Sequence, residues 1–359
     1  MTNVFEKMKF PCGKIMPNRL ALAPLTNTQS NVDGSLSDEE IKWLAMRAEG
    51  GFGITMTAAA HVNSAGQGFP GQFGVFNDDH LAGLKKLAKI IKAQGSLAVV
   101  QLHHAGLRSP RELIGEMPVA PSPSEKFSAR GLSHGEVKSL IEDFITGAER
   151  AKAAGFDGVE LHAAHNYIIC QFLSSEFNQR TDEYGGSLQN RSRVLFDIIT
   201  GIRERCGEEF LLGVRLTPER HGIELEEAIA TAKVLFEKKE IDFLDISAWN
   251  VYKEPVDEAL QGRSLLSYFT ELDRGAIRLS AAGKVYTPED INYCLDVGLD
   301  FVLMGRAAML HHNYPALLKS DSGFVPNRIP VSRDYLLAEG LSERFIDYVG
   351  GQWPDFIGS

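Results

Sequence analysis

Short apolar runs alternate along the chain with longer segments in which apolar residues return every three or four positions. The short runs are typical of buried β-strands, whereas the longer spacing is typical of amphipathic helices. Eight runs predict strands at Arg19–Thr26, Gly53–Ala58, Ser96–Leu102, Gly158–His162, Phe210–Arg215, Asp242–Ile246, Ala276–Ser280 and Asp300–Met304. The chain is therefore expected to alternate between strands and helices.

Capping signals mark where several of the helices begin. Ser37 with Glu40, and Ser133 with Glu136, have the spacing of a capping box, and Asn77 is a further N-cap. Thr287-Pro288 couples an N-cap with proline at the first helical position. The predicted helices are Ser37–Glu49, Asn77–Ala93, Ser133–Ala154, Asn190–Cys206 and Leu225–Lys239, with others starting at Thr287 and near Arg306.

Eight strands that alternate with helices predict a single α/β domain over residues 1–359, a (β/α)₈ TIM barrel. A doubly wound sheet is the alternative, but no GxGxxG motif follows the first strand. Residues 1–18 predict an N-terminal hairpin that plugs one end of the fold, and residues 320–359 a C-terminal extension. Residues 103–133 form a long irregular segment, which favours a functional excursion over a disordered flap.

Composition narrows the class of protein. Hydrophobic residues make up 44% of the chain and charged residues 23%, as in soluble globular proteins. The net charge of −10 argues against nucleic acid or an anionic membrane as partner, and no apolar run approaches the roughly 20 residues of a membrane span. The N-terminus lacks the apolar core of a signal peptide, so we expect a cytoplasmic protein acting on a small molecule; a homo-oligomer stays open.

The four cysteines are scattered along the chain without a CxxC pair. Such spacing favours reduced, structural thiols over a disulfide framework, a zinc site or an iron–sulfur cluster. We therefore expect no metal site built on these cysteines.

Polar residues and glycines stand just past the predicted strands, where a barrel of this kind carries its active site. They are Pro24, Leu25 and Thr26; Thr57; Gln101; His162, His165 and Tyr167; Arg215; Trp249; Gly283 and Lys284; and Gly305 and Arg306. This agreement follows from spacing alone.

His162, His165 and Tyr167 offer two imidazoles and a phenol close to one strand end. Such a set can hold an oxygen on which negative charge develops and deliver a proton beside it. Two histidines three residues apart also suit half of a metal site, or a helix cap. A metal-dependent barrel hydrolase that adds His103 or His104 is therefore a rival hypothesis.

Two further features suggest an anionic ligand. Gly283-Lys284 and Gly305-Arg306 follow the last two strands, where this fold commonly binds phosphate, although both glycines also suit tight turns. Arg215 belongs to a barrel strand, and a buried arginine is costly without an anionic partner.

The run from His162 to Arg191, HAAHNYIICQFLSSEFNQRTDEYGGSLQNR, resembles the signature of the Old Yellow Enzyme family, FMN-dependent ene-reductases built on a TIM barrel. Asn18-Arg19-Leu20 through Pro24-Leu25-Thr26 also resembles a family segment. The resemblance implies that FMN is bound, with Thr26 near flavin O4, Gln101 at the pyrimidine edge, Arg215 near N1, and the last two loops at the phosphate. The implied FMN-binding residues are Pro24, Leu25, Thr26, Thr57, Gln101, Arg215, Gly283, Lys284, Gly305 and Arg306.

The resemblance also implies an activity. NAD(P)H would reduce FMN, the flavin N5 would pass hydride to the β-carbon of an α,β-unsaturated carbonyl or nitro compound, and Tyr167 would protonate the α-carbon. His162 and His165 would hold the carbonyl oxygen, with Trp249 in the substrate pocket. The chain departs from the family's usual pattern at Thr28, at Met56-Thr57-Ala58, at His103-His104 and in the tail after Val331. A flavin-binding barrel without catalysis is the second rival.

Overall fold

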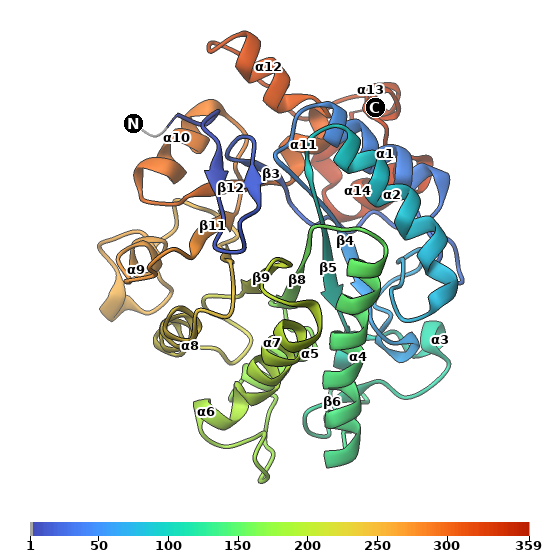
Figure 1. Ribbon diagram of the computed structural model, residues 1–359, viewed down its shortest axis with the longest axis vertical. Helices are drawn as coiled ribbons and strands as arrows, with labels where there is room; N and C mark the ends of the chain where they lie inside the picture. Colours follow the sequence, from blue (N-terminus) through green and yellow to red (C-terminus); the bar gives the residue numbers. More distant parts are fainter. Residues whose placement is uncertain (1–2, 359) are drawn as a thin grey trace.

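Eight parallel strands close into a barrel in the computed structural model, which describes residues 3–358 (Figure 1). Going round it, each strand pairs with the next one along the chain, and the last pairs with the first. The barrel strands are β3 (Leu20–Leu22), β4 (Ile54–His61), β5 (Leu97–His103), β8 (Gly158–Ala163), β9 (Leu211–Leu216), β10 (Phe243–Ser247), β11 (Arg278–Ala282) and β12 (Phe301–Met304). The predicted (β/α)₈ barrel is confirmed. The doubly wound alternative is wrong, because it requires an open sheet with two edge strands, whereas here the last strand pairs with the first.

The helices between the strands bury their apolar side against the barrel. Those that cover it are α1 (Asp38–Glu49), α2 (Leu81–Ala93), α4 (His134–Ala153), α7 (Arg193–Cys206), α8 (Leu225–Lys238), α10 (Pro288–Asp296) and α11 (Arg306–Leu310). The boxes that begin α4 and α10 are complete, with both reciprocal hydrogen bonds formed. The capping signals at Ser133 and Thr287 therefore predicted the first residues of α4 and α10 correctly.

The predicted capping box at Ser37 is only half formed. The Ser37 hydroxyl accepts from the Glu40 backbone N–H, but the Glu40 carboxylate turns inward, where it accepts from Asn27 and Ser30. Burial raises the pKa of Glu40 to about 7. The prediction failed because two buried donors from a distant loop compete with the helix end for the same carboxylate.

Other differences are shifts of a few residues. Strand β11 starts two residues later than predicted, and β4 continues to His61 through a register shift between Met56 and Ala59. Asn77 caps a 3₁₀ turn, Asp78–His80, and α2 follows it. The unpredicted helices α5 (Ile168–Leu173), α6 (Leu188–Arg191) and α9 (Ser267–Thr270) lie in the connections after β8 and β10.

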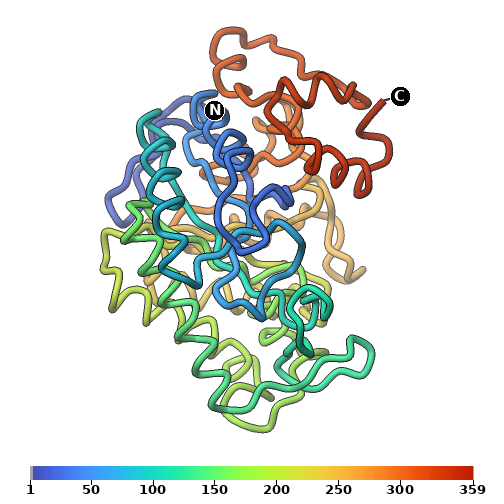
Figure 2. Tube along the Cα trace, turned by 90° about the vertical axis from the view of Figure 1, so that its right-hand side faces the viewer, coloured from blue at the N-terminus to red at the C-terminus, as the bar shows by residue number. Residues whose placement is uncertain are grey.

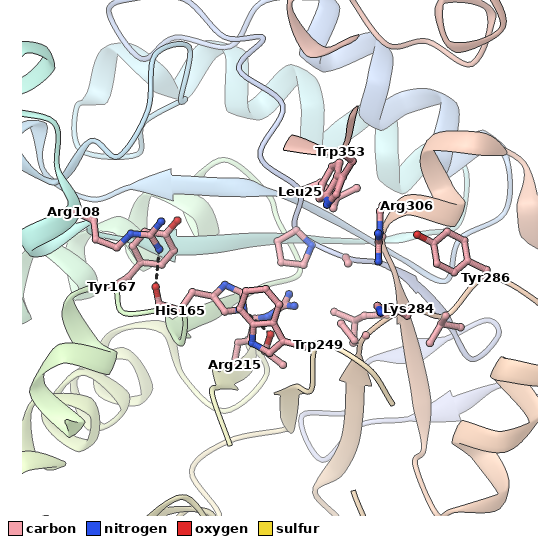
Figure 3. A pocket seen from close by; sticks show the side chains of 18 residues that line it. Leu25, Arg108, His165, Tyr167, Arg215, Trp249, Lys284, Tyr286, Arg306 and Trp353 are labelled. Atoms are coloured by element: carbon pink, nitrogen blue, oxygen red, sulfur yellow. Dashed lines mark hydrogen bonds between the residues drawn. The ribbon is translucent and has the colours of Figure 1, made fainter. Parts of the chain in front are cut away.

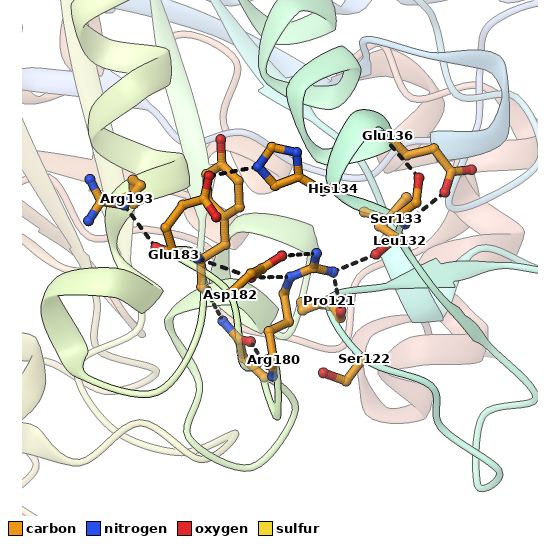
Figure 4. A network of polar contacts seen from close by, with 12 residues as sticks. Pro121, Ser122, Leu132, Ser133, His134, Glu136, Arg180, Asp182, Glu183 and Arg193 are labelled. Carbon is orange, nitrogen blue, oxygen red and sulfur yellow. Dashed lines mark hydrogen bonds and ion pairs between the residues drawn. The ribbon is translucent and has the colours of Figure 1, made fainter.

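The irregular segment after β5 is folded onto the barrel. It contains the 3₁₀ turn η3 (Gly106–Arg108), helix α3 (Arg111–Ile114) and the paired strands β6 (Val119–Ala120) and β7 (Arg130–Gly131). Arg180 holds it to the loop after β8: the guanidinium pairs with Asp182 and donates to the Pro121 carbonyl at 2.9 Å and the Leu132 carbonyl at 2.5 Å (Figure 4).

Both ends of the chain pack against the barrel. Strands β1 (Met8–Lys9) and β2 (Ile15–Met16) form an antiparallel hairpin, and its Phe10 ring lies 5.9 Å from both Phe243 and Phe301, which begin β10 and β12. The hairpin thus closes the N-terminal end of the barrel, as predicted.

The C-terminal extension gathers at one end of the molecule, drawn red in Figure 2. Helix α12 (Tyr314–Ser320) leads into this extension, which contains α13 (Arg333–Ala338), α14 (Glu343–Gln352) and the turn η5 (Pro354–Phe356). Phe345 of α14 packs edge-on against Trp43 of α1 at 4.9 Å. Within the described residues, no helix is long and apolar enough to cross a membrane.

Candidate active site

A cavity of about 300 Å³ opens at the C-terminal ends of the barrel strands (Figure 3). Ten residues predicted from the sequence line it: Pro24, Leu25, His165, Tyr167, Arg215, Trp249, Gly283, Lys284, Gly305 and Arg306. They come from six different strand ends, and the closed barrel is what brings them together.

The other four predicted residues lie beside or beneath the cavity. His162 is buried, with its ring centroid 4.8 Å from that of Tyr167. Gln101 is buried and donates from Nε2 to Glu160 Oε1 at 2.7 Å. The Thr57 hydroxyl donates to the Ala58 carbonyl at 2.7 Å, and Thr26 is half-buried.

The loop after β8 folds sharply to bring the imidazoles together. His165 has a φ of 60°, in the left-handed region, and its backbone N–H donates to Thr217 Oγ1 at 2.9 Å. The His165 ring lies 5.0 Å from that of His162 and 6.4 Å from that of Tyr167. Its Nε2 is 2.5 Å from the Ser247 hydroxyl, which fixes the orientation of the ring. The two histidines and the phenol therefore form one cluster.

Both imidazoles of this cluster are held neutral. Burial lowers the pKa of His162 well below its usual value, and the neighbouring His165 and His103 add to the effect. Burial likewise lowers the pKa of His165, with the Arg215 and Arg108 cations reinforcing it. A neutral imidazole donates from one ring nitrogen only. At neutral pH each histidine can thus offer one N–H to an oxygen without itself carrying charge.

Arg215 lies at the floor of the cavity within a buried layer of charge. Its Nε is 3.3 Å from Asp245 Oδ2, and its buried Nη1 has no hydrogen-bond partner within the described chain. Burial raises the pKa of Asp245 and that of Glu160, the latter to about 8, while Arg215 opposes both shifts. A buried guanidinium with unused donors suits an anionic or hydrogen-bond-accepting ring edge above it. Arg215 therefore fits the N1 side of a flavin.

The loops after β11 and β12 form the opposite end of the cavity. A Cβ at Gly283 would lie 2.8 Å from backbone atoms of Trp249 and Asn250, so this approach of two loops requires glycine. Arg306 lies between two aromatic rings, 5.1 Å from the centre of Tyr286 and 5.4 Å from that of Trp353. Together with Lys284 it supplies two cations beside exposed loop backbone, a donor set that fits a phosphate group.

Three polar or aromatic residues of the cavity were not predicted from the sequence: Arg108, Tyr286 and Trp353. Tyr286 comes two residues after Lys284, so counting on from the end of β11 would have found it. Arg108 belongs to the irregular segment, and Trp353 comes from the C-terminal extension. No local pattern predicts where either segment docks.

The metal-dependent hydrolase gains no support from this geometry. Within residues 3–358, no group of three or more His, Cys, Asp or Glu side chains is placed to hold a metal ion. His103, one of the two histidines that this hypothesis offered as a third ligand, packs edge-on against Tyr167 at 4.2 Å.

Comparison with known proteins identifies the family. Residues 3–270 match the model of the NADH:flavin oxidoreductase / NADH oxidase family. The chain is 35% identical over 328 residues to the probable NADH-dependent flavin oxidoreductase YqiG of Bacillus subtilis, covering 88% of this chain and 87% of that one. It is 33% identical to an NADPH dehydrogenase of Listeria innocua, covering 85% and 91%.

Solved structures show the same likeness. The old yellow enzyme homologue from Zymomonas mobilis superimposes with a TM-score of 0.81 at 26% identity, over 96% of this chain and 99% of that one. Some curated relatives are longer, and the chain spans only 35%, 49% and 32% of three of them. The chain belongs to the NADH:flavin oxidoreductase / NADH oxidase family, in its Old Yellow Enzyme group, and is an FMN-dependent oxidoreductase that takes its electrons from NADH or NADPH.

Proposed function

We propose that this enzyme reduces the activated C=C bond of α,β-unsaturated carbonyl or nitro compounds. The observation that carries the proposal is the cluster of His162, His165 and Tyr167 at the cavity, in which two neutral N–H donors lie beside a phenol. FMN, when bound, supplies the hydride that it has received from NAD(P)H.

In this proposal the two histidines act on the substrate oxygen. Negative charge develops on that oxygen as the β-carbon is reduced, and a donor already aimed at it gains strength at that moment. Removal of one such donor typically costs about 3 kcal/mol of transition-state stabilisation. The Ser247 hydroxyl at 2.5 Å holds the His165 ring in place, so little reorganisation is needed.

Tyr167 is proposed as the acid that protonates the α-carbon. Its backbone caps α5, and its ring packs edge-on against His103 and His162, which limits its motion. A phenol is a weak acid in water, but a carbanion-like carbon held against it is a strong enough base to take its proton.

We also propose how the cavity holds FMN. Gly283, Lys284, Gly305 and Arg306 would bind the phosphate, while Arg215 and Gln101 would face the pyrimidine edge of the ring. Pro24, Leu25, Thr26 and Thr57 would complete the ring pocket, and Trp249 the substrate side. The unused donors of Arg215 support the ring assignment.

Two variants separate the oxygen-binding role from the acid role. Tyr167→Phe should be reduced by NADH and bind phenols much as the wild type does, yet its flavin should be reoxidised slowly by 2-cyclohexenone. A quinone needs no proton on carbon, so it should still reoxidise this variant quickly. His162→Ala should weaken phenol binding and slow reoxidation by the enone.

Rapid-mixing absorbance measurements of the flavin give all of these rates. If Tyr167→Phe reduces the enone at the wild-type rate, another group is the acid and the role assigned to Tyr167 is wrong. If neither variant differs from the wild type with the enone, this cluster does not carry ene-reduction.

A further inference from the structure

Cations line the active-site cavity, and none of the described residues that line it carries a carboxylate. Its charged residues are Arg108, Arg215, Lys284 and Arg306, although the chain as a whole has a net charge of −10. A cavity with charge of one sign attracts ligands of the opposite sign and raises their local concentration. Bound FMN accounts for only part of this charge.

Three of the four cations suit the flavin by position. Arg215 belongs to β9 at the floor, and Lys284 and Arg306 belong to the loops after β11 and β12. Arg108 lies at the other end of the cavity, beside Tyr167 and His165 (Figure 3). It is therefore separate from the cations of the phosphate end.

Arg108 has donors to spare. Its Nη1 donates to the His165 carbonyl at 2.7 Å, and its guanidinium carbon lies 4.7 Å from the centre of the Tyr167 ring. A guanidinium carries five N–H donors in a fixed fork that matches a carboxylate. The side chain is exposed, and no acidic partner lies within ion-pair distance of it in the part of the chain that the structure describes.

A second arginine stands near the same end. Arg220, in the loop after β9, lies 5.1 Å over the Trp249 ring and is likewise exposed without an acidic partner among residues 3–358. Arg108 and Arg220 both help to lower the pKa of His221, after the larger effect of burial and against the carboxylate of Glu176, so both cations lie near this imidazole. Two uncompensated guanidiniums thus border the substrate side of the cavity.

We propose that the oxidising substrate carries a carboxylate in addition to its activating carbonyl or nitro group, and that Arg108 binds this carboxylate. The inference rests on the proposed function, because it concerns the acceptor of that reaction. Arg108 contacts the residues assigned to the reacting carbon and oxygen, so the carboxylate would lie within a small molecule's reach of the double bond. Arg220 would strengthen the attraction from the rim.

A matched pair of acceptors tests this proposal. The acid 3-oxocyclohex-1-ene-1-carboxylate and its methyl ester share one enone and differ in charge. For the wild type, kcat/KM should favour the acid. Arg108→Gln should lower the acid-to-ester ratio by about 10-fold or more, as expected for lost charge-assisted hydrogen bonds. Arg108→Lys keeps the positive charge but loses the paired donors of the guanidinium, so its acid-to-ester ratio should fall between those of the wild type and Arg108→Gln.

The control is Arg111→Gln, which removes an exposed charge from α3 in the same segment but does not line the cavity. It should leave the acid-to-ester ratio unchanged. Binding of 4-hydroxybenzoate and its methyl ester, followed by flavin absorbance, gives a second readout without turnover. Arg108→Gln should weaken the acid about 10-fold more than the ester.

Several results would overturn the proposal. Equal losses for acid and ester would mean that Arg108 only positions the His165 loop. A loss confined to flavin reduction by NADH would assign the anion site to the nicotinamide nucleotide instead. If the wild type reduces neither acceptor, the proposed function fails, whereas selective binding of 4-hydroxybenzoate would still support the carboxylate site.

Discussion

Glu160→Gln should make the enzyme more stable at high pH, because the folded protein buries the Glu160 carboxyl where its ionised form is disfavoured. It is fully buried beneath the cavity, its Oε1 accepts from Gln101, and its Oε2 has no hydrogen-bond partner within the described chain. Burial raises its pKa to about 8, the carboxyl of Asp245 adds to the rise, and Arg215 opposes it. Glutamine keeps the accepting oxygen and removes the titration.

The sign follows from the direction of this shift. Below about pH 4.5 the carboxyl is neutral in both folded and unfolded chains, so the pKa shift changes nothing there. As pH rises toward 8, the unfolded chain loses the proton while the folded chain keeps it, and stability falls. At about 1.4 kcal/mol for each pH unit, the upper bound is about 5 kcal/mol, and coupling of the titration to that of Asp245 makes the actual difference smaller.

Urea unfolding followed by circular dichroism at pH 5, 7 and 9 measures this difference in FMN-saturated protein. The free energy of unfolding of Glu160→Gln should exceed that of the wild type by a margin that grows with pH. Glu204→Gln, an exposed change on α7, is the matched control and should follow the wild type at every pH. Parallel curves for Glu160→Gln and the wild type would show that the carboxyl is already ionised in the folded protein, and would refute the reasoning.

Three further predictions concern the cofactor and the thiols. Arg215→Met should lower the flavin reduction potential by about 50 mV, or about 2 kcal/mol for two electrons, in a dye-coupled titration; an unchanged potential would leave Arg215 a purely structural role. Arg306→Ala should weaken FMN binding by about 10- to 100-fold, seen as flavin fluorescence released on dilution; full retention would count against the phosphate assignment. Burial raises the pKa of all four thiols, to about 11 or 12, so iodoacetamide at pH 8 should react slowly with native enzyme and rapidly in urea. A cysteine-free variant that folds should keep its turnover, and a large loss there would reveal a catalytic thiol.

The barrel was predictable because each strand is a short buried run and each connection carries its own capping signal. The same logic placed Tyr167 and Arg215 at strand ends, where the closed barrel makes them neighbours. Periodicity says nothing about segments that dock from a distance. Trp353 reaches the cavity only because α14 packs on α1. Arg108 reaches it only because hydrogen bonds from Arg180 hold the irregular segment against the loop after β8.

Competition between hydrogen-bond donors for one carboxylate explains why the predicted capping box at Ser37 is incomplete. Glu40 has the spacing of a capping residue, yet two buried donors draw its carboxylate inward. Such choices depend on distant side chains, so no local spacing rule predicts them.

An anaerobic two-step experiment tests ene-reduction most directly. The purified enzyme, with FMN bound, is first titrated with NADH until the flavin absorbance is bleached, and excess nicotinamide is removed. One equivalent of 2-cyclohexenone is then added by rapid mixing. The flavin absorbance should return in a single turnover, with one equivalent of cyclohexanone formed. Flavin that stays bleached with the enone, yet is reoxidised by oxygen or a quinone, would contradict it.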